Sequence, residues 1–100
     1  MNIKCIKTII GEDLIGEVQD TLSGDLKIIN PCAIIMVPMQ NNQFTIGLAP
    51  YMPFVQTKEF TYDPKNILFL CDPTVELKNE YNRIMGTGIV IPKTELSLIK

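Results

Sequence analysis

Residues 9–38 constrain the fold more than any other part of this 100-residue chain. They read IIGEDLIGEVQDTLSGDLKIINPCAIIMVP, and turn signals stand at Gly11-Glu12-Asp13 and at Ser23-Gly24-Asp25. Between these turns, Leu14, Gly16 and Val18 alternate with Ile15, Glu17 and Gln19. A period of two is typical of a β-strand with one buried face. The stretch therefore predicts consecutive β-strands joined by tight turns.

Two runs, residues 32–37 and 67–71, are apolar on both faces of the strand that each predicts. A small antiparallel protein normally leaves one face of its sheet in water. We therefore expect these two strands to have a second cover, which is either another sheet layer or another subunit.

The rest of the chain also reads mainly as short strands and turns. Asn41-Asn42 predicts a hairpin, because asparagine tolerates positive φ. Residues 49–55 contain two prolines and predict a loop, which either folds back on the core or contacts another subunit. The further strands are expected at residues 1–10, 26–29, 44–48, 58–62 and 89–92, before a tail at 93–100.

One helix is predicted over residues 73–85. Asp72 is a good N-cap, and Pro73 suits the first helical position. The helix is expected to end at Gly86 or Gly88, where glycine supplies positive φ. Its apolar stripe is formed by Leu77, Tyr81, Ile84 and Met85.

Composition excludes several classes of function. Nine Lys and Arg against eleven Asp and Glu give a net charge of −2, whereas proteins that bind duplex DNA are usually basic. No apolar run approaches the ~18 residues of a membrane span, and no signal-peptide pattern begins the chain. The hydrophobic content of 46% indicates one folded domain over residues 1–100.

The residues that usually carry catalysis or bind metals are missing or scattered. The chain has no histidine, so it lacks the commonest general base and metal ligand. Its three cysteines, Cys5, Cys32 and Cys71, form no C-x-x-C pair and suggest neither a zinc site nor a disulfide scaffold. Gly11 and Gly16 have the glycine spacing of a P-loop, but no Lys-Ser/Thr pair follows. We expect no enzyme and no cofactor, with free thiols in a reducing cytoplasm.

Short bent strands with turn-sized connections are expected to form a small SH3-like barrel of about five strands over residues 1–71, followed by the helix and tail of residues 72–100. Within that class the chain resembles the Sm-like (LSm) family, including its phage-encoded members. The segments IIGEDLIGEV, residues 9–18, and FTYDPKNILFL, residues 60–70, are similar to its two motifs. For a phage-encoded member, the location would be the host cytoplasm.

The resemblance implies a homo-oligomeric ring of five to seven subunits that binds single-stranded RNA at its pore. The doubly apolar runs supply the expected subunit interface, with Ile34, Met36, Leu68 and Leu70. The matching pore loops supply Asp20, Ser23, Lys65 and Asn66 as the expected RNA-binding residues. Those loops hold Asp20, Asp25 and Asp63 against Lys65 alone, so a structural or protein-recruiting ring without RNA stays open as the alternative. Neither a membrane nor duplex DNA is an expected partner.

Overall fold

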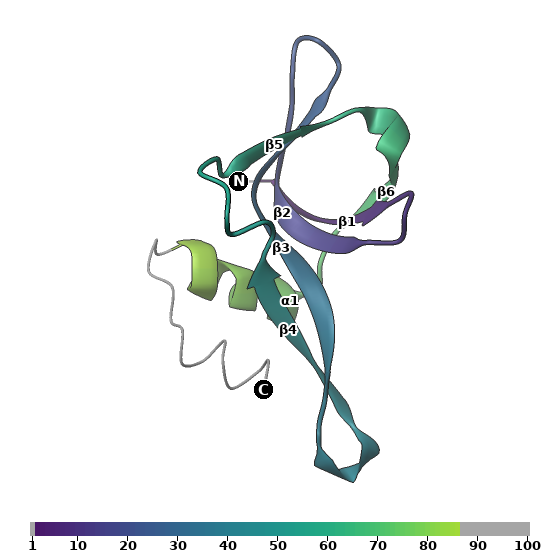
Figure 1. Cartoon of the computed structure of the whole chain (residues 1–100), viewed down its shortest axis with the longest axis vertical. Coiled ribbons are helices and arrows are strands. Elements are labelled where there is room, and N and C mark those ends of the chain that lie inside the picture. Colours follow the sequence, from purple (N-terminus) through teal and green to yellow (C-terminus); the bar gives the residue numbers. More distant parts are fainter. Residues whose placement is uncertain (1, 87–100) are drawn as a thin grey trace.

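A computed structural model describes residues 2–86, and these form one antiparallel β-sheet followed by a helix (Figure 1). The expectation of a mainly β protein with one C-terminal helix is confirmed, with six strands in place of about five. The predicted strand at 89–92, the tail at 93–100 and Gly88 lie outside the described residues. The strands are β1 (Ile3–Thr8), β2 (Asp13–Asp20), β3 (Leu26–Pro38), β4 (Phe44–Pro50), β5 (Glu59–Tyr62) and β6 (Ile67–Cys71), and the helix is α1 (Val75–Tyr81).

The sheet has the order β4-β3-β2-β1-β6, and β5 pairs with the first part of β3. A short 3-10 turn, η2 (Pro64–Asn66), connects β5 to β6. The strands curve, so that β5 and β6 reach the same side of the sheet through η2 (Figure 1). Among residues 2–86, β5 and β6 are not paired with each other, so the sheet is not closed.

Strand β3 bends sharply and pairs with two strands along one of its edges. The sequence predicts separate strands at residues 26–29 and 32–37, with Asn30-Pro31 between them, but the structure has one strand of 13 residues. Asn30 adopts a φ of 51°, and the opposite register shifts between Ile15 and Glu17 of β2. The bend lets the first half of β3 pair with β5 and the second half pair with β4. The β3–β4 hairpin extends away from the rest of the molecule (Figure 1), and its turn uses positive φ at Asn41 and Asn42, as predicted.

The sheet has an apolar core on each face. On the concave face, buried side chains of β1, β2 and β3 pack together: Ile6, Leu14, Val18, Leu26 and Ile28. On the other face, Ile3, Ile15, Cys32 and Leu48 pack against Tyr81 and Ile84 of the helical segment. Residues 32–37 of β3 were expected to need a second cover because they are apolar on both faces. Over Cys32 and Ile34, the chain's own helix supplies that cover.

The helix begins two residues later than the sequence predicts. Thr74 is the N-cap, and its Oγ1 accepts a hydrogen bond of 3.2 Å from the Leu77 N–H. Asp72 instead accepts a hydrogen bond from Lys4 of β1, which lowers the pKa of Asp72. The predicted apolar stripe is confirmed, because all four of its residues pack in the core beneath the helix. After Tyr81 the helix continues as a π-helical turn, η3 (Asn82–Gly86).

The proline-containing loop after β4 has one face on the core and one in solvent. Tyr51 packs against the concave core, and its ring meets that of Phe60 edge to face at 5.6 Å. Phe54 is 80% exposed. The packing of Tyr51 agrees with a loop folded back on the core, and the exposed Phe54 leaves a subunit contact as the untested alternative.

Candidate functional site

The two loops predicted to bind RNA extend from the same end of the sheet. Register pairs Asp20, at the end of β2, with Leu26, at the start of β3. Leu26 in turn pairs with Tyr62, at the end of β5. The β2–β3 turn and η2 therefore begin from adjacent strand ends, as a shared loop surface requires.

Within the β2–β3 turn, the polar side chains hold the turn itself. The Thr21 and Ser23 hydroxyls lie 2.9 Å apart, and the Ser23 Oγ donates to Asp25 Oδ2 at 3.3 Å. The Thr21 hydroxyl also donates to the Asp25 carbonyl. Gly24 supplies the positive φ of 91°. Asp20 is exposed and makes no side-chain hydrogen bond or ion pair with any residue between 2 and 86, which leaves its carboxylate available to solvent.

In η2, the side chain of Lys65 is exposed while the backbone is fixed. Asp63 caps the turn by accepting from the Lys65 N–H at 3.0 Å. The Asn66 carbonyl accepts from the Ile9 N–H at 3.0 Å, which ties η2 to the β1–β2 turn. Both Lys65 and Asn66 are exposed, so their side chains are accessible to a ligand. No hydrogen bond or ion pair within residues 2–86 joins η2 to the β2–β3 turn.

Most cations in the described part of the chain are already paired with acids. Lys4 pairs with Asp72, Lys7 with Asp13, and Lys27 with Glu59. Arg83 pairs with Glu80. Lys65 is thus the exposed lysine that the two predicted RNA-binding loops offer to an anionic ligand, and the same loops carry Asp20 and Asp63.

The four predicted interface residues lie at two different parts of the sheet. Leu68 and Leu70 belong to β6, which pairs only with β1 among the described strands. Leu68 is 59% exposed, and its neighbour Phe69 is 53% exposed. Met36 is 62% exposed on the β3–β4 hairpin, whereas Ile34 packs against the core under α1. β6 is thus an apolar edge strand, and such a strand is a ready template for pairing with another chain.

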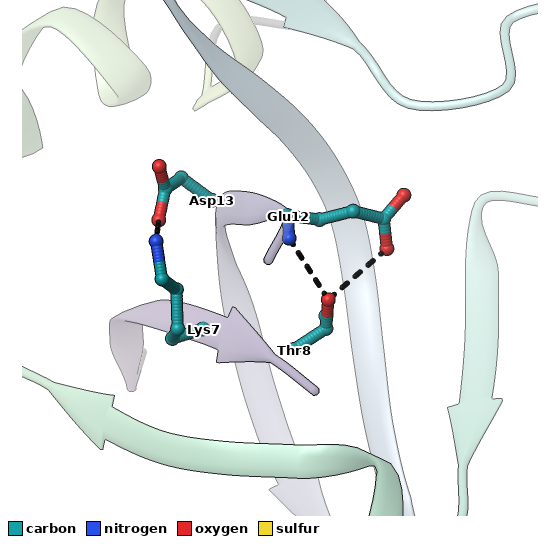
Figure 2. Close-up of polar contacts among 4 residues, drawn as sticks. All are labelled: Lys7, Thr8, Glu12 and Asp13. Carbon is teal, nitrogen blue, oxygen red and sulfur yellow. Dashed lines mark hydrogen bonds and ion pairs between the residues drawn. The ribbon is translucent and has the colours of Figure 1, made fainter. Parts of the chain in front are cut away.

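The β1–β2 turn carries a group of polar side-chain contacts (Figure 2). The buried Thr8 hydroxyl donates to the Glu12 carboxylate at 3.4 Å and accepts from the Glu12 N–H at 3.1 Å. Lys7 and Asp13 pair across the turn at 2.8 Å. The Tyr51 hydroxyl donates to the other oxygen of Glu12 at 3.4 Å. The polar groups of this turn are therefore paired with one another, and their contacts fix the turn.

Residues 2–86 contain no group of three or more His, Cys, Asp or Glu side chains placed to hold a metal ion. Burial, followed by the smaller effect of its hydroxyl interaction with Tyr51, raises the pKa of Tyr62 well above its ordinary value. A tyrosine shifted in this direction keeps its proton at neutral pH and is a hydrogen-bonding group rather than a base.

A groove between β4 and α1 was not anticipated from the sequence. Its walls are Phe44, Ile46 and Leu48 of β4 and Leu77, Glu80 and Arg83 of the helical segment. The helix stripe and the β4 alternation were both visible in the sequence. The open space between β4 and α1 could not be predicted from the sequence, because it depends on how far β4 extends beyond the helix.

Comparison with models of known protein families and with the sequences of curated proteins finds no match. None of the helices in the described part is both long and apolar enough to cross a membrane.

Proposed function

We propose that this chain is an Sm-like protein, a strongly bent SH3-like barrel that assembles into a homo-oligomeric ring and binds single-stranded RNA through its pore loops. The observation that carries the proposal is the arrangement of one end of the sheet. The β2–β3 turn and η2 start from adjacent strand ends, and η2 lies between the two open strands β5 and β6. Loops beside the edges that join subunits would face a common centre in a ring.

The proposed assembly step is strand pairing between subunits. The open edge of β6 pairs with the open edge of β5 in the next subunit, which continues the sheet around a ring of five to seven copies. Such a contact joins two different edges, so it closes only when the rotation between subunits completes a circle. Closure removes two edges that would otherwise promote aggregation, and it covers the exposed side chains of Leu68 and Phe69.

The proposed RNA contact is electrostatic at Lys65, with the amide of Asn66 available to base edges. One exposed lysine in each subunit becomes a ring of lysines through symmetry, which is how an acidic chain attracts phosphates. Asp20 and Asp63 are multiplied in the same way. The Asp63 carboxylate is occupied by the Lys65 N–H, whereas that of Asp20 is free to repel phosphates.

The acidic residues favour a second candidate function, a structural or protein-recruiting ring without RNA. It shares the assembly step with the first candidate and differs only in what the loops contact. A binding experiment therefore distinguishes the two.

The test is the binding of uridine-rich and adenine-rich single-stranded RNA to the full chain at two salt concentrations, with Lys65→Ala beside the wild type. We expect salt-dependent binding that is lost or strongly weakened in Lys65→Ala. Each lost lysine–phosphate contact lowers the steepness of the salt dependence, by a slope of about 0.7 for a single strand.

Lys78→Ala is the matched control, because Lys78 is an exposed lysine on α1, away from both loops. It should bind RNA as the wild type does. An equal loss in both variants would assign the attraction to net charge and not to the loop. An absence of wild-type binding at low salt would leave the ring without RNA as the better account.

A further inference from the structure

Two of the three cysteines are brought together by the strand register. Cys5 of β1 is the direct register partner of Cys71 of β6, although 65 residues separate them in the sequence. Directly opposed residues of an antiparallel pair have Cα atoms about 4.5–5.5 Å apart. This separation lies within the range of about 4.4–6.8 Å that a disulfide spans, and side chains directly opposed across strands share one face of the sheet.

The neighbouring pair fixes the same register. Lys4 precedes Cys5 and Asp72 follows Cys71, and the Lys4 ammonium donates a hydrogen bond to the Asp72 carboxylate. The ion pair continues the cross-strand ladder by one step, so it holds the two thiols opposite each other. The two cysteines also influence each other, since Cys71 contributes to the raised pKa of Cys5, after the larger contribution of burial.

The two thiols differ in access. Cys71 is exposed, whereas Cys5 is partly buried against the core under α1, and Cys32 is fully buried. An oxidant in solution therefore reaches Cys71 first, and Cys5 is the thiol placed to react with the product.

From this placement we propose that Cys5 and Cys71 form a reversible cross-strand disulfide when the protein meets hydrogen peroxide. The Cys71 sulfur attacks the peroxide, the O–O bond breaks, and Cys71 becomes a sulfenic acid as one water is released. The Cys5 sulfur then attacks the Cys71 sulfur, the S–O bond breaks, and the hydroxyl leaves with the Cys5 proton as a second water. Two thiols and one peroxide give one disulfide and two waters.

The consequence would be a covalent connection between β1 and the edge strand β6. This strand carries the exposed apolar residues and makes its only described pairing with β1. The disulfide goes beyond the proposed function and does not depend on ring assembly, because the thiols belong to one subunit.

The experiment treats the folded full-length protein with hydrogen peroxide at low protein concentration. Remaining thiols are then alkylated in denaturant, and the protein is digested with trypsin without reduction. Cleavage after lysine releases Cys5 in residues 5–7 and Cys71 in residues 66–78. The expected product is these two peptides joined, with the loss of two hydrogens, and a reductant should separate them. Cys32→Ser is the matched control and should keep the joined product.

Cys71→Ser and Cys5→Ser should each lose the product. Oxidation of the denatured wild type, in which no register holds the thiols, should give all three pairings. If the folded protein gives disulfides between separate chains, or Cys5 joined to Cys32, or sulfinic acid at Cys71 with Cys5 still free, the inference is overturned. Circular dichroism of each variant shows whether a lost product reflects a lost fold.

Discussion

Gly16 of β2 lies against β3 with no room for a side chain. A Cβ atom at this position would lie 2.8 Å from Cγ2 of Ile28 and 3.2 Å from the Ile29 carbonyl oxygen. The second of these atoms is backbone, in the part of β3 that bends at Asn30, so it has little freedom to move. The glycine is thus required by packing, at the point where the β2–β3 register shifts.

We predict that Gly16→Ala lowers the free energy of unfolding by about 1–3 kcal/mol, the usual cost of overfilling a packed site. Chemical denaturation measures this change. Gly47→Ala is the control, since its Cβ would meet only side chains of Val37 and Ile35, at 3.2 Å or more. If Gly16→Ala costs no more than Gly47→Ala, the close approach does not constrain this position.

The sequence marked Gly16 as part of a glycine-containing motif, but it could not show why glycine is needed there. The reason lies in β3, more than ten residues away. Cys5 and Cys71 show the same limit more strongly, because no spacing rule connects them and only the β1–β6 register places them opposite each other. Lys65 and Asn66 were placed correctly in an exposed turn, since Asp63-Pro64 is a local turn signal.

At the scale of elements, hydrophobic periodicity predicted the helix correctly. The local capping signals at Asp72 and Pro73 predicted its start two residues too early. Leu77, Tyr81 and Ile84 pack as predicted, because a stripe repeated over two turns depends on many residues at once. Asp72 and Thr74 are both good caps. Lys4 of the distant strand β1 engages Asp72, and Thr74 caps the helix. β3 was predicted as two pieces because proline is rare inside a strand, yet the bend at Asn30 accommodates Pro31.

Tyr81 connects α1 to the bend of β3. Its buried hydroxyl donates to the Asn30 carbonyl at 2.9 Å, and the Ile29 carbonyl lies 3.3 Å away. Burial raises the pKa of Tyr81 above its ordinary value of 10.0. In the folded state the neutral phenol is therefore favoured, so its contribution is fully present below pH 10.0 and is lost as the pH rises through the folded-state value.

We predict that Tyr81→Phe lowers the free energy of unfolding at neutral pH by about 1–2 kcal/mol, because it removes a hydrogen bond and leaves a partly buried carbonyl without its donor. The variant should also lose less stability than the wild type between pH 9.5 and 11, a window chosen around the ordinary tyrosine value of 10.0. Urea denaturation across this window tests both parts. The pKa of Tyr62 is also raised, so the variant should still lose some stability at alkaline pH. Identical pH profiles for the two proteins would show that Tyr81 does not titrate with unfolding.

For the whole molecule, the sequence indicated more apolar surface than a small sheet needs, but not how that surface is divided. Cys32 and Ile34 are covered by α1 of the same chain, while Leu68 and Phe69 of β6 remain exposed. Both strands look alike in sequence. The difference arises because the chain after β6 returns across β1 to cover β3 and β4, which leaves β6 at the edge of the sheet.

This division sharpens the assembly prediction. Leu68 is 59% exposed on an edge strand, so we expect Leu68→Asp to leave the subunit folded while it places a charge in the proposed β5–β6 contact between subunits. We expect light scattering at micromolar concentration to give a mass of five to seven subunits for the wild type and a much smaller mass for Leu68→Asp, with circular dichroism unchanged.

Val75→Asp is the control, because Val75 is 71% exposed on α1, outside both strand edges, and its mass should match that of the wild type. A monomeric wild type, or a Leu68→Asp protein that assembles fully, would reject the ring. An equal loss of mass in both variants would place the contact away from the β6 edge.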